Sequence, residues 1–142
     1  MKIVRSVLIV DDVPADVEWC KMMLEASGGF ASVMVAKDGS DAINLYENYE
    51  ESRRKFPEIF PPLLILLDIA MPGLDGFEFL ERYEIMRTKD ARLDGASVVV
   101  MLTSSDETTD RQRASEFPIV KDYVVKPLSE ARARELADIF GS

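Results

Sequence analysis

The sequence predicts an open parallel α/β sheet that is covered by helices on both faces. Five short apolar runs alternate along the chain with longer segments of helical character, which is the pattern of a doubly wound sheet. The runs are rich in β-branched residues and lack a clean alternation of apolar and polar positions, as expected for strands buried on both faces. The predicted strands are Val4 to Val10, Ala31 to Val35, Leu63 to Leu67, Ser97 to Leu102 and Asp122 to Val125.

The first two helices are predicted from their ends and from the spacing of their apolar residues. Pro14 suits the first turn of a helix, and the pair Gly28-Gly29 ends it. The apolar positions of this helix recur every three or four residues, at Val17, Cys20 and Leu24. The second helix follows Asp38-Gly39, and its packing positions are Ala42, Ile43 and Tyr46.

Three further helices follow in the second half of the chain. Asp75 is expected to cap the third helix, whose inner side carries Phe79, Leu80, Tyr83 and Met86. The fourth, about Glu107 to Ser115, is almost entirely polar, so its stability must come from its surroundings. The last begins at Ser129 and repeats apolar residues at Ala133, Leu136, Ala137 and Phe140.

The segment from Glu50 to Pro62, between the second helix and the third strand, is the least regular part of the chain. It combines mixed charge with three prolines. Because a residue that precedes proline disfavours helical backbone, we expect the end of a helix followed by an extended loop.

The length of 142 residues predicts one domain, residues 1–142, with a core from about 4 to 140 and no effector domain. No apolar run is long enough to cross a membrane, and the first five residues lead straight into a strand pattern without the layout of a signal peptide. We therefore expect a cytoplasmic protein that does not bind membranes.

Composition excludes several kinds of functional site. The chain has no histidine and a single cysteine, Cys20, so an intrachain disulfide, a His/Cys zinc site and a Ser-His or Cys-His nucleophile pair are all excluded. The formal net charge of -9 argues against direct binding to nucleic acid or anionic lipid. Of the site types considered, a metal site with oxygen ligands remains possible.

Polar side chains follow four of the predicted strands at the point where each strand ends. These side chains are Asp11 and Asp12 after the first strand, Asp68 after the third, Thr103 after the fourth and Lys126 after the fifth. In an open parallel sheet, the carboxyl ends of the strands form the ligand-binding edge. The sequence thus predicts three carboxylates, a hydroxyl and an ammonium at one edge.

This set of groups suits phosphoryl transfer with Mg²⁺. Mg²⁺ prefers carboxylate and phosphate oxygens, and a bound cation together with Lys126 lets neighbouring carboxylates stay ionised. Phosphoryl transfer needs a nucleophile, a cation and donors aimed at the phosphoryl oxygens. We expect Asp68 to be the nucleophile and also a ligand of Mg²⁺, Asp12 and less directly Asp11 to hold Mg²⁺, and Thr103 and Lys126 to contact the phosphoryl oxygens.

Five motifs occur in order along the chain: Leu8 to Asp12, Ala36 to Gly39, Leu67 to Gly76, Leu102 to Ser104 and Asp122 to Leu128. Each alone is weak, but together they make the sequence resemble bacterial response-regulator receiver domains, from Val4 to about Phe140. The resemblance is to the CheY-like, single-domain response regulators of two-component systems. It implies a flavodoxin-like (βα)5 fold, a doubly wound five-stranded parallel sheet with strand order 2-1-3-4-5.

The resemblance also implies residue roles that composition does not show. In such receivers the residue matching Asp68 accepts phosphate from a histidine kinase, the residue matching Asp12 binds Mg²⁺ directly, and the backbone carbonyl matching Ala70 completes the protein ligands of the metal. Residues matching Thr103 and Tyr123 form a switch that remodels the face made by the fourth helix, fifth strand and fifth helix. A cis peptide bond is expected between Lys126 and Pro127.

The partners implied are a sensor histidine kinase or histidine phosphotransfer protein and an output protein. Output occurs either by binding or by onward phosphotransfer in a phosphorelay, and the sequence leaves both open. The chain is expected to be a phosphoacceptor with at most slow self-phosphorylation and self-dephosphorylation, not an enzyme. Ala70 and Ser105 differ from common family choices at positions that tune dephosphorylation, so the phosphate lifetime is open.

Two other functions compete with this interpretation. A Mg²⁺-dependent phosphohydrolase of the haloacid dehalogenase type also uses an aspartate nucleophile, but that family has two aspartates two residues apart after its first strand, whereas Asp11 and Asp12 are adjacent. A flavodoxin-like nucleotide binder would need a Gly/Ser/Thr-rich phosphate loop after the first strand. The residues Asp11 to Pro14 present carboxylates there instead.

Overall fold

All five apolar runs form strands of one parallel sheet in the computed structural model, which describes residues 1–142. The strand order is β2-β1-β3-β4-β5, and every neighbouring pair is parallel. The predicted flavodoxin-like sheet and its order are therefore confirmed. The strands are β1 Val7–Val10, β2 Val33–Ala36, β3 Leu64–Leu67, β4 Val98–Thr103 and β5 Val120–Val125.

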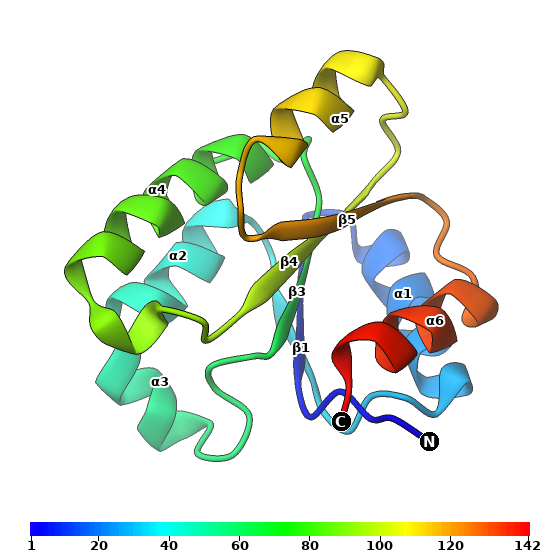
Figure 1. Ribbon diagram of the computed structural model, residues 1–142, viewed down its shortest axis with the longest axis horizontal. Helices are drawn as coiled ribbons and strands as arrows, with labels where there is room; N and C mark the ends of the chain where they lie inside the picture. The colour runs from blue at the N-terminus through cyan, green and yellow to red at the C-terminus, as the bar shows by residue number, and fades with distance from the viewer.

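Helices cover both faces of this sheet (Figure 1). Helices α1 and α6 lie together on one face, whereas α2 and α4 lie together on the other, and α5 contacts β5. None of the helices is long and apolar enough to cross a membrane. The helices are α1 Pro14–Ser27, α2 Gly39–Glu47, α3 Tyr49–Lys55, α4 Gly76–Lys89, the short 3-10 helix η1 Ala91–Leu93, α5 Thr108–Ser115 and α6 Glu130–Phe140.

Two hydrophobic cores lie on opposite faces of the sheet, and each strand contributes to both. Along β1, Leu8 and Val10 belong to the core under α2 and α4, whereas Val7 and Ile9 belong to the core under α1 and α6. Successive side chains of a strand point to opposite faces. This is why the central strands β1 and β3 are apolar at every position and show no alternation.

Helix ends follow the predicted capping residues. The carboxylate of Asp75 accepts a hydrogen bond from the backbone N–H of Glu78, and the carboxylate of Glu78 accepts one from the backbone N–H of Asp75, which completes a capping box at the start of α4. Gly28 ends α1 with a φ of 69°, a left-handed conformation that glycine adopts without a Cβ clash. The cap of α4 matters for function because α4 begins just after the loop that carries Asp68.

The segment that follows α2 differs from the prediction. Tyr49–Lys55 forms a separate helix, α3, and not merely the tail of α2. Its apolar spacing is poor, and tertiary contacts hold it: the Ser52 hydroxyl donates to the carbonyl of Leu45 at 2.7 Å, and the Arg92 guanidinium lies 4.1 Å from the centre of the Tyr49 ring. With α3 counted, the helices predicted as fourth and fifth become α5 and α6.

Candidate functional site

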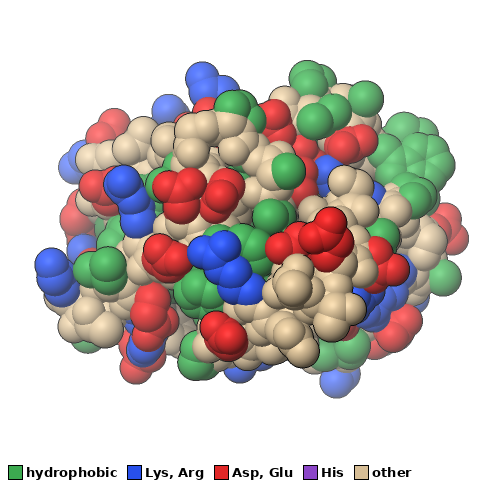
Figure 2. Space-filling view, turned by 90° about the horizontal axis from the view of Figure 1, so that it is seen from above, with side chains coloured by type: hydrophobic (Ala, Val, Ile, Leu, Met, Phe, Trp, Pro, Cys, Tyr) green, Lys and Arg blue, Asp and Glu red, His purple; other side chains and the backbone are tan.

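The predicted site residues converge because of the strand register. Val10 of β1 pairs with Leu67 of β3, so Asp11 and Asp68, the next residues in each chain segment, lie side by side at the carboxyl edge. The backbone N–H of Lys126, the first residue after β5, donates to the carbonyl of Thr103 at 2.8 Å. Figure 2 shows the molecule from above, where exposed acidic side chains are spread among basic and apolar ones.

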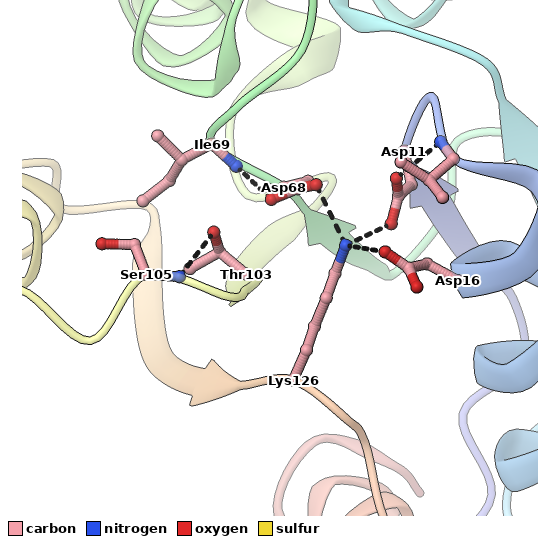
Figure 3. Close-up of polar contacts among 8 residues, drawn as sticks. Asp11, Asp16, Asp68, Ile69, Thr103, Ser105 and Lys126 are labelled. Carbon is pink, nitrogen blue, oxygen red and sulfur yellow. Dashed lines mark hydrogen bonds and ion pairs between the residues drawn. The ribbon is translucent and has the colours of Figure 1, made fainter.

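Lys126 lies at the centre of the site (Figure 3). Its Nζ donates to Asp11 Oδ2 at 2.7 Å, to Asp16 Oδ2 at 2.9 Å and to Asp68 Oδ2 at 3.0 Å. The side chains of Lys126, Asp11 and Asp68 are only 14%, 5% and 7% exposed. One ammonium therefore faces three carboxylates in a region that water reaches poorly, and the site keeps an excess of negative charge.

Two opposing effects set the protonation of Lys126. Burial by itself lowers the pKa of the ammonium, but the hydrogen bonds to Asp11, Asp16 and Asp68 outweigh burial and raise the pKa of Lys126 above its ordinary value. Lys126 is thus protonated at neutral pH and can donate hydrogen bonds to an anion.

Backbone N–H groups fix the other oxygens of the two buried carboxylates. Asp11 Oδ1 accepts from the N–H of Val13 at 3.0 Å, and Asp68 Oδ1 accepts from the N–H of Ile69 at 2.8 Å. Both carboxylates are therefore held at two points, one by Lys126 and one by the backbone. Such fixed orientation is what a nucleophile and a metal ligand need.

The acidic group also fits a divalent cation. Carboxylate oxygens of Asp11, Asp12 and Asp68 lie within 4.8 Å of one another, and Asp12 Oδ1 is buried without any hydrogen-bond partner. A buried oxygen without a partner costs free energy, and a hard cation with oxygen ligands would satisfy it. Ala70 lies exposed in the loop after Asp68, and its role as a carbonyl ligand stays a prediction.

Thr103 and Tyr123, the predicted switch residues, are joined through Ser105. Thr103 is buried, and its Oγ1 lies 3.4 Å from the backbone nitrogen of Ser105, which donates to it. The Tyr123 hydroxyl donates to the carbonyl of the same Ser105 at 2.7 Å. The Arg111 guanidinium of α5 lies 4.5 Å from the centre of the Tyr123 ring. A shift of Thr103 would thus be felt at Tyr123 and α5 through one loop residue.

Sequence reasoning missed one member of the site, Asp16. It lies in the first turn of α1, where an acidic residue is ordinary, and nothing local shows that its carboxylate reaches Lys126, 110 residues later. A second contact joins the same two parts of the chain, since Trp19 Nε1 donates to the carbonyl of Leu128 at 2.8 Å. No signal in the local sequence could have identified Asp16 as a member of the site.

Comparisons with known proteins agree with this geometry. A family model described as the response regulator receiver domain matches residues 7–138. Protein PilH of Pseudomonas aeruginosa is 33% identical over 124 residues, which is 87% of each chain. A two-component response regulator from Cytophaga hutchinsonii has 26% identity and a TM-score of 0.79 over 98% of each chain.

A complex that contains CheX, CheY, BeF3 and Mg²⁺, from Borrelia burgdorferi, also matches, with 28% identity and a TM-score of 0.70 over 99% of this chain and 92% of the other. Family model, sequence relative and solved structures all point to the same signalling switch, a phosphoacceptor, and do not favour the phosphohydrolase. The chain therefore belongs to the family of response regulator receiver domains.

Proposed function

We propose that Asp68 is the phosphoacceptor of this receiver domain and that it takes its phosphoryl group from a phosphohistidine, with Mg²⁺ at Asp11, Asp12 and the backbone carbonyl of Ala70. The observation that carries the proposal is the buried carboxylate of Asp68, held by Lys126 at 3.0 Å beside an acidic group in which Asp12 Oδ1 lacks a partner. The site combines a fixed nucleophile with a place for a cation.

In the proposed step, a carboxylate oxygen of Asp68 attacks phosphorus and forms an acyl phosphate. The bond between phosphorus and the histidine nitrogen breaks, and that nitrogen leaves as the departing group. Mg²⁺ would supply charge neutralisation between the phosphoryl oxygens and the carboxylates. The residues of the chain do the positioning: Lys126 and Thr103 donate to phosphoryl oxygens, and Ile69 N–H keeps the Asp68 side chain oriented.

The output of the switch would lie at the face made by α5, β5 and α6. Thr103 moves toward the phosphoryl group in this proposal, and Tyr123 follows because Ser105 contacts both residues. A protein partner would read the altered face, or a phosphotransfer protein would take the phosphoryl group onward. A single receiver domain over residues 1–142, located in the cytoplasm with its kinase or phosphotransfer partner, completes the proposal.

The test is phosphorylation by a small donor. Protein with Mg²⁺ and acetyl phosphate should gain one phosphoryl group by intact mass, whereas Asp68→Asn should gain none and Asp138→Asn, an exposed carboxylate on α6, should behave as the wild type. Circular dichroism verifies that the variants are folded. A wild-type protein that gains no phosphoryl group, or a folded Asp68→Asn protein that gains it equally, would refute the proposal.

A further inference from the structure

Asp16 makes a contact that its place in the helix does not require. It lies in the first turn of α1, whose N-cap residue Val13 provides no side-chain cap, yet its carboxylate does not cap the helix. Instead Asp16 Oδ2 accepts a hydrogen bond from Lys126 Nζ at 2.9 Å. The Asp16 side chain is 45% exposed, in contrast with the buried carboxylates of Asp11 and Asp68.

The contact matters because a lysine ammonium has three N–H donors. Lys126 directs one donor to each of Asp11, Asp16 and Asp68, so every donor is engaged. A phosphoryl oxygen that approaches Asp68 can bind Lys126 only by taking a donor from a carboxylate. Asp16 is the one of the three that lies outside the group of oxygens suited to a cation.

Electrostatics add to this competition. A phosphodonor such as acetyl phosphate carries negative charge, and it must approach an edge where carboxylates already outnumber the ammonium. The Asp16 carboxylate adds a further negative charge at the exposed side of Lys126. Both effects, the engaged donor and the repulsion, weaken the initial binding of an anionic donor.

We propose that Asp16 is a positioning residue that shares the Lys126 ammonium with the incoming phosphoryl group and thereby slows phosphorylation by anionic donors. The proposal deepens the function proposed for Asp68 and rests on it. Asp16 acts through Lys126 and does not touch the reacting atoms. Its effect is expected in the donor concentration needed for half-maximal rate, and not in the maximal rate, because it changes donor binding.

The contact between Asp16 and Lys126 can be tested without Mg²⁺ or phosphate. Limited acetylation with acetic anhydride, measured by peptide mass spectrometry, should modify Lys126 at least twofold faster in Asp16→Asn than in wild type, because the neutral amide of asparagine holds the ammonium less strongly than a carboxylate does. The exposed Lys37 and Lys121 serve as internal references. Glu18→Gln removes the same charge from α1 at a side chain that pairs only with Lys21, and should leave Lys126 labelling unchanged. Equal labelling of Lys126 in wild type and Asp16→Asn would overturn the claim that Asp16 holds the ammonium.

The kinetic test uses Mg²⁺ and acetyl phosphate. Asp16→Asn should be phosphorylated about two- to fivefold faster at low donor concentration, the range expected for a half-exposed ion pair. Asp16→Glu should restore a rate near wild type, and Glu18→Gln should leave the rate unchanged. In a Lys126→Met background the Asp16→Asn effect should shrink to the small part that charge repulsion alone supplies. The same acceleration in that background would show that Asp16 does not act through Lys126.

The two proposals fail in different ways. A wild-type protein that takes up no phosphoryl group overturns the function proposed for Asp68, while the labelling of Lys126 still decides whether Asp16 holds the ammonium. Normal phosphorylation with equal rates in wild type and Asp16→Asn overturns only the role of Asp16.

Discussion

The two ends of the sheet contain buried polar groups of different kinds. Neutral hydroxyl groups are buried at the amino end, whereas charged side chains are buried at the carboxyl end. At the amino end, the Ser97 hydroxyl donates to the carbonyl of Pro62 at 2.5 Å. Since its only hydrogen is engaged there, the Tyr46 hydroxyl must be the donor in the 2.9 Å contact between Tyr46 and Ser97. At the carboxyl end, Asp12 Oδ1 has no partner, and Lys126 faces three carboxylates.

The packing of aromatic side chains also differs between the two ends of the sheet. Aromatic rings surround the amino-end network: Tyr46 lies edge-on to Tyr83 with ring centres 5.0 Å apart and 5.3 Å from Phe60. We call the five rings of Tyr46, Tyr49, Phe60, Phe79 and Tyr83 the aromatic cluster. One neutral hydroxyl at this end, that of Ser6, is buried without a partner, but no charged side chain is buried there. The comparison teaches that folding free energy comes from the end where aromatic rings pack around neutral polar groups. The other end keeps charge that only a ligand can neutralise.

The largest effect is expected from the aromatic cluster. Phe79→Ala removes a ring that is 0% exposed, and the free energy of unfolding should fall by about 3 to 5 kcal/mol because a cavity is left. Urea unfolding measures it, with Ile85→Ala, an exposed residue of the same helix, as control. Phosphorylation per folded molecule should be unchanged. If Phe79→Ala lowers the free energy of unfolding no more than Ile85→Ala does, the aromatic cluster is not the main source of stability.

Mg²⁺ should give the next largest effect, at the opposite end. A free Mg²⁺ concentration of 100 times the Kd should raise the free energy of unfolding by about 2.7 kcal/mol, measured by urea unfolding against NaCl at equal ionic strength. Asp12→Ala should gain much less. Equal stabilisation of wild type and Asp12→Ala would place the cation elsewhere.

The smallest effect is a gain of stability from a substitution at the carboxyl end, in contrast with the loss expected for Phe79→Ala. Without divalent cations, Asp12→Ala should raise the free energy of unfolding by about 1 kcal/mol, because it removes a buried oxygen without a partner and one of several like charges. Asp94→Ala, at an exposed carboxylate, provides the comparison and should be no more stable than wild type. Destabilisation by Asp12→Ala would mean that Asp12 is a structural residue.

The sheet could be predicted from sequence because its central parallel strands, β1 and β3, are buried and apolar at every position, and the carboxyl-edge residues follow from where the strands end. The predicted boundaries needed small changes. β1 begins at Val7 and not at Val4, which makes only an isolated bridge to Phe30. β5 begins at Val120, two residues before the predicted Asp122. The sequence pattern missed these two residues because they are partly exposed at the edge of the sheet and include the polar Lys121.

The parts that could not be predicted depend on contacts between distant segments. Helix α3 has little apolar periodicity and is held by Arg92 and by the ring of Phe60, which lies 5.3 Å from that of Tyr49. Asp16 becomes a site residue only when α1 packs against the segment that follows β5. Local pattern contains neither fact, since both arise from tertiary packing between segments that are separated in the sequence.

The hydrogen bond from Trp19 to Leu128 has a practical use. Trp19 is the only tryptophan of the chain, so all indole fluorescence arises from one ring, which is 45% exposed and touches the loop that begins at Lys126. Movement of this loop should alter the emission wavelength and quenching of the ring. The protein thus contains its own optical probe, and events at Lys126 can be followed by stopped-flow fluorescence without an attached dye.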